Sequence, residues 1–474
     1  KTLVGKEYLP LFDYFVGKLQ KPAWKIVEAD YVNTEEGTGI VHQAPAFGEE
    51  DYDTIRKAGL AFVQPVDKSG KFTSDVPDFE GMFVKDADKQ IIEMLDKNNS
   101  LFSKQKYKHS YPFCWRCDTP LLYYALKSWF VRVTAMKERL IELNREIKWY
   151  PSHIRSGRFG DWLDNVKDWA LSRNKFWGTP LPIWKCESCN RQTAIGSIEE
   201  LEAGAGKNLK DLDLHKPAVD EIKIACTCGK KMQRVPYVID AWYDSGSASF
   251  AQFHYPFENK EEFEKHFPYS FITEGVDQTR GWFYTLHVLG TLLFDSMAYK
   301  SVVVSGLIMD ENNEKMSKSK GNVFNPFEVF DTIGADATRL QFCTVSPDNT
   351  KRFGYELVRE NVSPFLNTLW NVCVFTSNVI ASKKETFSEL NTEDKWIISK
   401  TNSLVKLFTE EFDDNNYHRC YEEIKWFVVE DLSRWYVRLV RDRSDDAVAD
   451  TLEYVLDVLA RLLAPFTPYL SEFI

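Results

Sequence analysis

The 474-residue chain has no apolar run that approaches the length of a membrane span, and its first residues lack the pattern of a signal peptide. It also lacks an excess of basic residues. The 59 Lys and Arg stand against 70 Asp and Glu, which gives a formal net charge of −11. That balance argues against a broad surface for non-specific nucleic-acid binding, but not against local basic patches that contact RNA. We expect a soluble cytoplasmic protein with no membrane partner.

Cysteine is present nine times, mostly in Cys-x-x-Cys or Cys-x-Cys spacings, which are more typical of metal binding in a reducing compartment than of disulfides. Two such pairs predict a closed, structural Zn²⁺ site with four thiolate ligands: Cys186, Cys189, Cys226 and Cys228. A third pair, Cys114 and Cys117, is half of such a site. The alternative for all six is that they are small buried side chains.

The chain length predicts roughly three domains. Because Lys1 leads directly into structured pattern, we expect a fragment. The expected divisions follow from apolar periodicity and from Gly and Pro punctuation. They are a β-rich part over 1–105 with a helix near 86–99, a connecting segment over 106–185, a cysteine-bearing insertion over 186–235 with an exposed loop at 203–210, an α/β unit over 236–355, and a helical part over 356–474.

The α/β unit has predicted strands at 270–273 and 301–305, with a helix at about 279–296 between them, a pattern typical of parallel sheets. Ligands of such sheets bind beyond the carboxyl ends of the strands. After the second strand comes the loop KMSKSKGN, residues 315–322. Its lysines and serines suit a polyphosphate, since ammonium groups stabilise the charge that develops on a departing pyrophosphate. The alternative is a solvated basic loop.

This eight-residue string resembles the KMSKS signature of class I aminoacyl-tRNA synthetases without a departure. The resemblance implies the second half of a class I Rossmann catalytic domain, which activates an amino acid with ATP to an aminoacyl-adenylate and passes the acyl group to the 3′ end of tRNA. Lys318 would contact the ATP phosphates, with Mg²⁺ accompanying the nucleotide. The implied catalytic residues are Lys315, Ser317, Lys318 and Ser319. Nothing in the chain resembles HIGH, the other ATP signature of the family.

The run TEGVDQTRGWF, residues 273–283, is similar to the isoleucine branch of this family, which implies L-isoleucine and tRNA(Ile) as substrates. The runs at 240–247 and 171–180 also resemble the family, but valine enzymes share the core of the former. The implied pocket has Trp242 and Trp282 as walls around the aliphatic side chain, with core packing as the alternative for each. The implied adenylate contacts are Glu274, Gly275, Asp277 and Gln278. A valine or leucine synthetase and a non-catalytic tRNA-binding relative remain alternatives.

The first part of the chain carries a second resemblance. Residues 37–52 closely resemble the second half of the family's editing site, where Asp51 would hold the α-amino group of a mischarged valine and His42 would lie near the terminal adenosine. The alternative for Asp51 is an acid that is favoured at a helix N-terminus by the helix dipole.

The last part, residues 356–474, resembles the α-helical anticodon-binding domain of this subclass, on the runs WYVR at 435–438 and APFTP at 464–468. A local basic patch of arginines near the C-terminus is a candidate RNA contact, but a solvated helix face is the favoured interpretation. The patch consists of Arg434, Arg438, Arg441 and Arg443.

Overall fold

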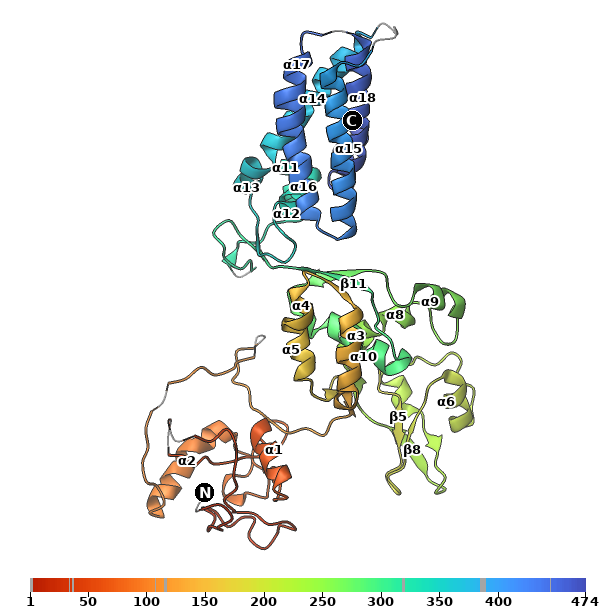
Figure 1. Ribbon diagram of the computed structural model, residues 1–474. Helices are drawn as coiled ribbons and strands as arrows, with labels where there is room; N and C mark the ends of the chain where they lie inside the picture. Colours follow the sequence, from red (N-terminus) through yellow and green to blue (C-terminus); the bar gives the residue numbers. More distant parts are fainter. Residues whose placement is uncertain are drawn as a thin grey trace. The chain divides into compact units, whose positions relative to one another are not determined.

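The computed structural model describes residues 3–33, 35, 38–106, 108–114, 117–317, 320–383, 389–443 and 445–474. The chain divides into two compact units, Lys1–Lys127 and Ser128–Ile474 (Figure 1). Among the described residues, no helix is long and apolar enough to cross a membrane.

The first unit contains helix α1 (Glu49–Lys57), a 3₁₀ turn η1 (Pro77–Phe79) and helix α2 (Val84–Lys97). Helix α2 confirms the helix that was expected near 86–99. The expectation of a β-rich fold over 1–105 is wrong, because the described residues of this segment form isolated bridges and no regular strand. The physical reason is that a strand requires a continuous hydrogen-bonded partner, and pairing between these extended segments stops at single bridges such as Glu7 with Lys25.

The second unit is built on a three-stranded parallel sheet with the strand order β10-β11-β2. The strands are β2 (Lys148–Tyr150), β10 (Ile272–Gly275) and β11 (Ser301–Ser305). Strand β11 reads Ser-Val-Val-Val-Ser and its three valines are buried, as in strands covered on both faces. The parallel α/β unit predicted from the sequence is therefore confirmed.

Helix α10 (Trp282–Phe294) connects β10 to β11 and is apolar on nearly every side, because it packs inside this unit. Figure 1 shows it beside α3 (Lys137–Glu146) and near α5 (Arg158–Asp164). The remaining short elements are β1 (Phe130–Val131), η2 (Val133–Met136), α4 (His153–Ser156), β3 (Trp169–Ala170), β4 (Ser172–Arg173), β9 (Val238–Ile239), α7 (Ala241–Gly246), α8 (Ala248–Ala251), α9 (Lys260–His266), η4 (Val276–Arg280), β12 (Ile308–Met309) and β13 (Lys351–Arg352).

The cysteine-bearing insertion forms an antiparallel sheet with the order β6-β5-β8-β7. Its elements are β5 (Ile183–Lys185), β6 (Gln192–Ala194), α6 (Ile198–Ala205), η3 (Ala218–Glu221), β7 (Ile224–Ala225) and β8 (Lys231–Arg234). The exposed loop expected at 203–210 is partly wrong, since it begins inside α6. Ser197 caps that helix through the backbone N–H of Glu200, and Gly206 ends it with a φ of 68°.

Residues 356–474 are helical as expected, and Figure 1 shows the long helices side by side. They share one core that includes Leu369, Ile397 and Leu452. The helical core begins before the expected boundary, because Val329 and Leu340 also belong to it. Its helices are α11 (Pro326–Ile333), α12 (Ala335–Cys343), α13 (Tyr355–Asn361), α14 (Ser363–Ala381), α15 (Thr392–Asp413), α16 (Tyr417–Trp426), the π-helical segment η6 (Phe427–Val437), α17 (Arg438–Val440), α18 (Asp446–Leu463) and α19 (Pro468–Phe473).

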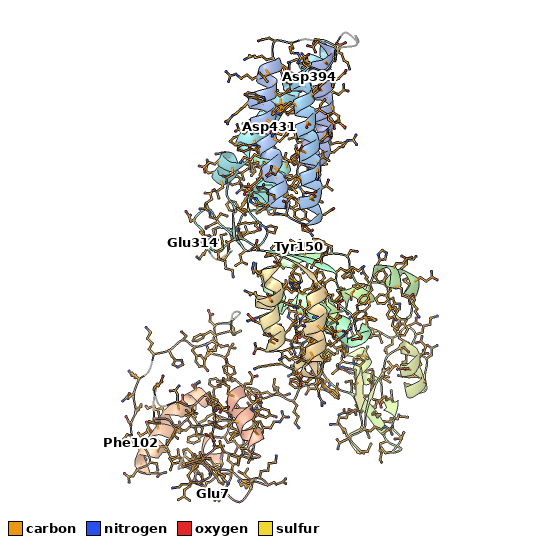
Figure 2. The ribbon with its side chains drawn as sticks, viewed as in Figure 1. Glu7, Phe102, Tyr150, Glu314, Asp394 and Asp431 are labelled. Carbon is orange, nitrogen blue, oxygen red and sulfur yellow. The ribbon has the colours of Figure 1, made fainter. Side chains whose placement is uncertain are left out.

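The basic patch considered for RNA binding is divided by this packing. Arg443 donates hydrogen bonds to the fully buried carboxylate of Asp394, which is labelled in Figure 2, and also pairs with Glu393 and Asp445. Arg443 therefore joins the start of α15 to the start of α18. Arg434 remains on the surface, where it pairs with Glu430 in the same helix. The solvated-face interpretation holds for Arg434, whereas Arg443 is a structural residue.

Candidate active site

The carboxyl end of β10 carries the predicted adenylate contacts. Glu274 and Asp277 are exposed there, one at the end of the strand and one in the 3₁₀ turn η4. A Cβ on Gly275 would lie 2.7 Å from a carboxylate oxygen of Asp277, so the Asp277 side chain lies close against the backbone at the end of the strand. Because β10 and β11 run parallel, their carboxyl ends open on the same edge of the sheet, where ligands of such sheets bind.

Gln278 links the turn to helix α10. Its Oε1 accepts a hydrogen bond of 3.0 Å from the backbone N–H of Trp282, and its Nε2 donates one of 2.8 Å to Asp277. The side chain thereby satisfies a donor at the start of the helix that has no intrahelical partner. The amide orients Asp277 and the first turn of α10 together.

Trp242 and Trp282 come from different elements and meet at Gly281. A Cβ on Gly281 would lie 2.9 Å from the ring of Trp242, which shows how closely that indole approaches the start of α10. The indole Nε1 of Trp282 donates a hydrogen bond of 2.9 Å to the carbonyl of Ser245 in α7. The structure therefore brings together the two tryptophans that the sequence placed in one pocket, and Trp242 is 42% exposed.

Asp240 positions the helix that carries Trp242, a role that sequence reasoning missed. Its buried carboxylate accepts hydrogen bonds from Arg173 at 2.6 Å and from the indole of Trp169 at 3.0 Å. It also accepts from the backbone N–H of Trp242 at 3.4 Å, as the N-cap of α7. An Asp directly before a helical pattern is the signal that was available in the sequence.

Asp244, also on α7, faces the segment at 171–180. It accepts a hydrogen bond of 3.0 Å from the hydroxyl of Thr179. Burial raises the pKa of its carboxyl group above the usual value, against the lowering effect of that hydroxyl. The runs at 171–180 and 240–247, which both resemble the family, are thus in direct contact.

The lysine loop, residues 315–322, follows β11 and β12 and leaves the sheet at the same edge. Strand β12 pairs in parallel with β13, and Met309 makes an antiparallel bridge to Lys315. Lys315 is exposed, and Ser317 is partly buried and donates its backbone N–H to Asn322 at 2.9 Å. The predicted catalytic residues Lys318 and Ser319 lie outside the described residues.

In the first unit, Asp51 lies in the first turn of α1, as the helix-terminus interpretation expects. One of its carboxylate oxygens accepts a hydrogen bond of 2.9 Å from the backbone N–H of Ala44, and the other accepts one of 3.3 Å from the hydroxyl of Tyr31. His42 is exposed, two residues before Ala44. The structure therefore ties Asp51 to the segment that contains His42.

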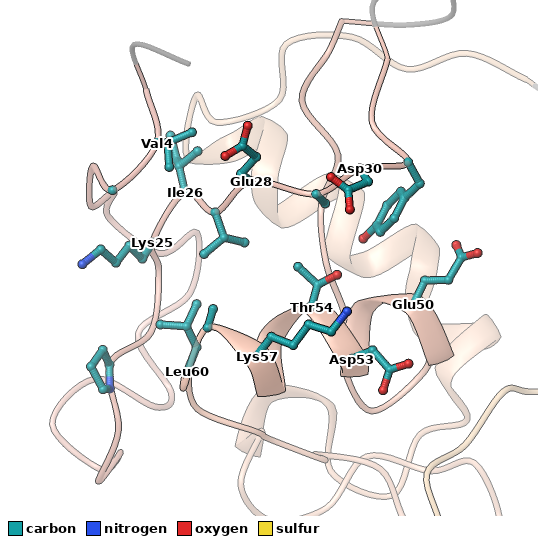
Figure 3. A pocket seen from close by; sticks show the side chains of 16 residues that line it. Val4, Lys25, Ile26, Glu28, Asp30, Glu50, Asp53, Thr54, Lys57 and Leu60 are labelled. Carbon is teal, nitrogen blue, oxygen red and sulfur yellow. The ribbon is translucent and has the colours of Figure 1, made fainter. Parts of the chain in front are cut away.

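A cleft of about 650 Å³ opens beside the same helix, with Glu50, Asp53 and Lys57 on one wall (Figure 3). Tyr31, the partner of Asp51, is also part of its lining. Neither Asp51 nor His42 is among the described residues that line it. Asp51 is thus bonded to a residue that lines this cleft, Tyr31, but neither Asp51 nor His42 lines the cleft itself.

The cysteines of the insertion converge at the ends of two hairpins. The four sulfur atoms of Cys186, Cys189, Cys226 and Cys228 lie within 4.8 Å of one another. Across the hairpins the Sγ–Sγ distances are 3.6 Å for both pairs, close to the roughly 3.8 Å of a tetrahedron with metal–sulfur bonds of about 2.3 Å. The donor set and its size therefore fit a Zn²⁺ ion.

The pKa values of these thiols also favour a bound cation. The backbone N–H of Cys189 lowers the pKa of the Cys186 thiol to about 6, although burial opposes it. The backbone N–H of Lys230 lowers the pKa of the Cys228 thiol, but the contact with Cys226, burial and the contact with Cys186 together raise that pKa to about 12. Four thiolates at this spacing thus require a cation to ionise together.

The segment that carries Cys114 and Cys117 has the same backbone hydrogen bonds as the hairpin that carries Cys186 and Cys189, here called the first hairpin. Asp118 has a φ of 52° and donates its N–H to the carbonyl of Cys114 at 2.9 Å, while the N–H of Cys114 donates to Thr119. In the first hairpin Asn190, with a φ of 59°, donates in the same way to Cys186, whose N–H donates to Arg191. The pair therefore has the local geometry of half a metal site. Among the described residues, no further Cys, His, Asp or Glu completes it.

Comparisons with known proteins cover the whole chain. The family model "tRNA synthetases class I (I, L, M and V)" matches residues 27–353, and "Anticodon-binding domain of tRNA ligase" matches residues 394–474. The isoleucine–tRNA ligase of Clostridium novyi is 48% identical, and that of Thermus thermophilus 47% identical, over 100% of this chain and 47% of each relative. The chain thus spans about half the length of these relatives.

Among solved structures, a Mycobacterium tuberculosis methionyl-tRNA synthetase in complex with methionyl-adenylate has a TM-score of 0.56 at 14% identity. The match covers 91% of this chain and 84% of that one. A second structure of that synthetase, bound by methionyl-adenylate, has a TM-score of 0.55 at 16% identity and covers 76% and 64%. At these identities the likeness is one of fold.

Proposed function

Because the chain belongs to the class I tRNA synthetases of the isoleucine, leucine, methionine and valine group, we propose that it carries the activation of L-isoleucine by ATP and its transfer to tRNA(Ile). In the first step a carboxylate oxygen of isoleucine attacks the α-phosphorus of ATP and pyrophosphate departs. In the second, a ribose hydroxyl at the 3′ end of tRNA attacks the acyl carbon and AMP departs. The chain contributes part of the complete enzyme that performs both steps.

The observation that carries this proposal is the common edge of the parallel sheet. There the indoles of Trp242 and Trp282 adjoin Gly281, and the lysine loop begins one strand away. Two flat indoles form a stiff apolar slot for a branched aliphatic chain, and the lysines of the loop neutralise the leaving pyrophosphate. We assign the phosphate contact to Lys318 with Lys315, supported by Ser317 and Ser319.

The remaining assignments at this edge follow from charge and exposure. Glu274 is exposed at the end of β10 and is suited to accept hydrogen bonds from ribose hydroxyls or from the amine of the adenylate. Asp277 and Gln278, which are hydrogen-bonded to each other, lie beside it, and Gly275 leaves room for close approach. Mg²⁺ enters with ATP, whose phosphate charge it shields.

Specificity for isoleucine over its aliphatic relatives is the finer part of the proposal. It is supported by the identity of 48% and 47% to two isoleucine–tRNA ligases over the whole chain. The complete enzyme should exchange pyrophosphate into ATP with isoleucine at least about 10-fold better than with valine or leucine, in line with the 10–200-fold limit for which isoleucine enzymes are the standard worked case. Preference for valine or leucine would assign it to a sister enzyme. No exchange at all would favour a non-catalytic tRNA-binding relative.

We also propose a hydrolytic editing role for the first unit, because a pocket that rejects one missing methylene only weakly needs a second site. Asp51 would attract the α-amino group of a mischarged valine on tRNA, and His42 would lie near the terminal adenosine. The hydrogen bond from the backbone N–H of Ala44 fixes the direction of the Asp51 carboxylate.

We assign a structural Zn²⁺ to the four-cysteine cluster, and we propose that Cys114 and Cys117 are half of a second site. The reduced thiolates that such sites require fit a cytoplasmic location. The helical domain after residue 355 is proposed to contact tRNA, and its matched family model carries the description of an anticodon-binding domain.

A further inference from the structure

The lysine loop starts at a carboxylate with little exposure. Asp310 follows β12 and is 8% exposed. Its Oδ1 accepts hydrogen bonds from the backbone N–H groups of Asn312 at 3.0 Å and Glu314 at 2.7 Å. Its Oδ2 accepts a hydrogen bond of 2.8 Å from the Nδ2 of Asn322. The two oxygens therefore bind donors from both ends of the loop.

Asn322 closes the loop from the other side. Its Nδ2 also lies 3.4 Å from the carbonyl of Lys315, and its Oδ1 accepts the backbone N–H of Ser317 at 2.9 Å. A carboxylate only accepts and a backbone N–H only donates, so the bridging side chain must donate at one end and accept at the other. The carboxamide of Asn322 does both, with Nδ2 as the donor and Oδ1 as the acceptor.

The backbone between these residues is shaped to bring Asn322 back to Asp310. The N–H of Lys320 donates to the carbonyl and the hydroxyl of Ser317 at 3.1 and 3.2 Å. Gly321 then adopts a φ of 70°, a left-handed conformation that costs other residues about 1–2 kcal/mol. The reversal therefore rests on local backbone contacts and on the glycine at position 321.

We propose that Asp310 and Asn322 are positioning residues for amino-acid activation: their hydrogen-bonded pair holds the two ends of the lysine loop so that its ammonium groups meet the ATP phosphates. This inference rests on the function proposed above. We assign neither residue a contact with ATP. Lysine stems are flexible, so the place where the loop backbone is held determines where the ammonium groups reach, and preorganisation of that kind contributes directly to rate.

The charge state of Asp310 agrees with this arrangement. The hydrogen bond from Asn322 and the N–H of Glu314 hold the pKa of the Asp310 carboxyl below its usual value. The group is therefore ionised at neutral pH and accepts every donor that faces it.

An exchange of the two side chains tests the pair in the complete enzyme. Asp310→Asn should set two amide donors against each other, and Asn322→Asp should set two carboxylates against each other. Each single variant should lower kcat/KM for ATP in isoleucine-dependent pyrophosphate exchange by about 10–100-fold, with KM for isoleucine unchanged. The double variant Asp310→Asn/Asn322→Asp restores one donor and one acceptor, and should return to within about threefold of wild type.

Loop order gives a second readout that does not require catalysis. Trypsin should cleave after the loop lysines faster in both single variants than in wild type, and at the wild-type rate in the double variant. Asp331→Asn, the same chemical change at an exposed position of α11, is the matched control and should alter neither rate.

Single variants that behave as wild type, or a double variant no better than the singles, would overturn the positioning role. If the wild-type enzyme fails to exchange pyrophosphate with isoleucine, the proposed function is wrong. The tryptic comparison then still decides whether the pair orders the loop.

Discussion

The indole nitrogen of Trp282 donates a hydrogen bond of 2.9 Å to the carbonyl oxygen of Ser245. Ser245 belongs to α7, which also carries Trp242, whereas Trp282 begins α10. The two walls of the proposed side-chain pocket are therefore joined by a direct bond between their helices. Because α10 is buried in the core of the α/β unit, the width of the pocket is set by rigid elements rather than by a loop.

Gly281→Ala should narrow this pocket. The added methyl group would lie 2.9 Å from the Trp242 ring and 2.5 Å from Oε1 of Gln278, so one of them must move. Overpacking of this kind costs about 1–3 kcal/mol, and we expect KM for isoleucine to rise roughly 5- to 150-fold in pyrophosphate exchange. Gly196→Ala, whose methyl would lie 3.5 Å from Glu200, is the control. An unchanged KM would place the isoleucine side chain elsewhere.

Asp51 offers a test that separates charge from structure. Asp51→Ala should abolish clearance of valyl-tRNA while leaving isoleucine activation intact. Asp51→Asn keeps an acceptor for the N–H of Ala44 but removes the charge, so it should fail equally if the carboxylate holds the amine of valine. Glu50→Ala removes another acid from the first turn of α1 and should retain clearance. Normal deacylation of valyl-tRNA by the Asn variant would reduce Asp51 to a structural role.

Metal analysis tests the cysteine cluster. The purified protein should contain at least one equivalent of Zn²⁺, and less than about half an equivalent would reject the site. Cys189→Ser should lose the metal and lower the melting temperature of the insertion, because its small core around Trp184 and Ile224 packs directly on the two ligand hairpins. Ser188→Ala, one residue away and not a ligand, should leave the metal content unchanged.

His287 should make the α/β unit sensitive to mild acid. Its ring is fully buried in α10, and Nε2 is paired with the carbonyl of Leu140 at 2.9 Å. Burial lowers the pKa of the imidazole to about 4, despite that bond. The unfolded chain binds a proton at about pH 6.5 and the folded chain only near pH 4, so stability should fall as the pH drops between these values, by about 3 kcal/mol in total.

Urea unfolding at pH 7 and pH 4.5 measures this loss for the wild type and for His287→Gln, which keeps a donor for Leu140 but does not titrate. The variant should lose less stability over this interval. An equal loss in both proteins would mean that other groups cause the acid sensitivity.

Most of the α/β unit was predictable because its signals are local. Val302, Val303 and Val304 mark a buried parallel strand by residue type alone. The helix between the strands was also expected, although its predicted start at about 279 falls in the 3₁₀ turn η4 and α10 begins at Trp282. The first unit was not predictable in the same way. Its extended segments look like strands, but a strand exists only where a partner pairs with it, and within the described residues these pairings remain single bridges.

By itself, the sequence determined the chemical identity of the candidate site: the lysine loop, the two tryptophans, the acidic end of β10 and the paired cysteines. Only the tertiary structure decided how they combine. It alone placed the ring of Trp242 against Gly281, brought the sulfur atoms of Cys186 and Cys228 to 3.6 Å, and paired Arg443 with the buried Asp394. The physical reason is that these contacts join residues far apart along the chain, and their distances depend on how helices and sheet pack rather than on any local preference of the residues.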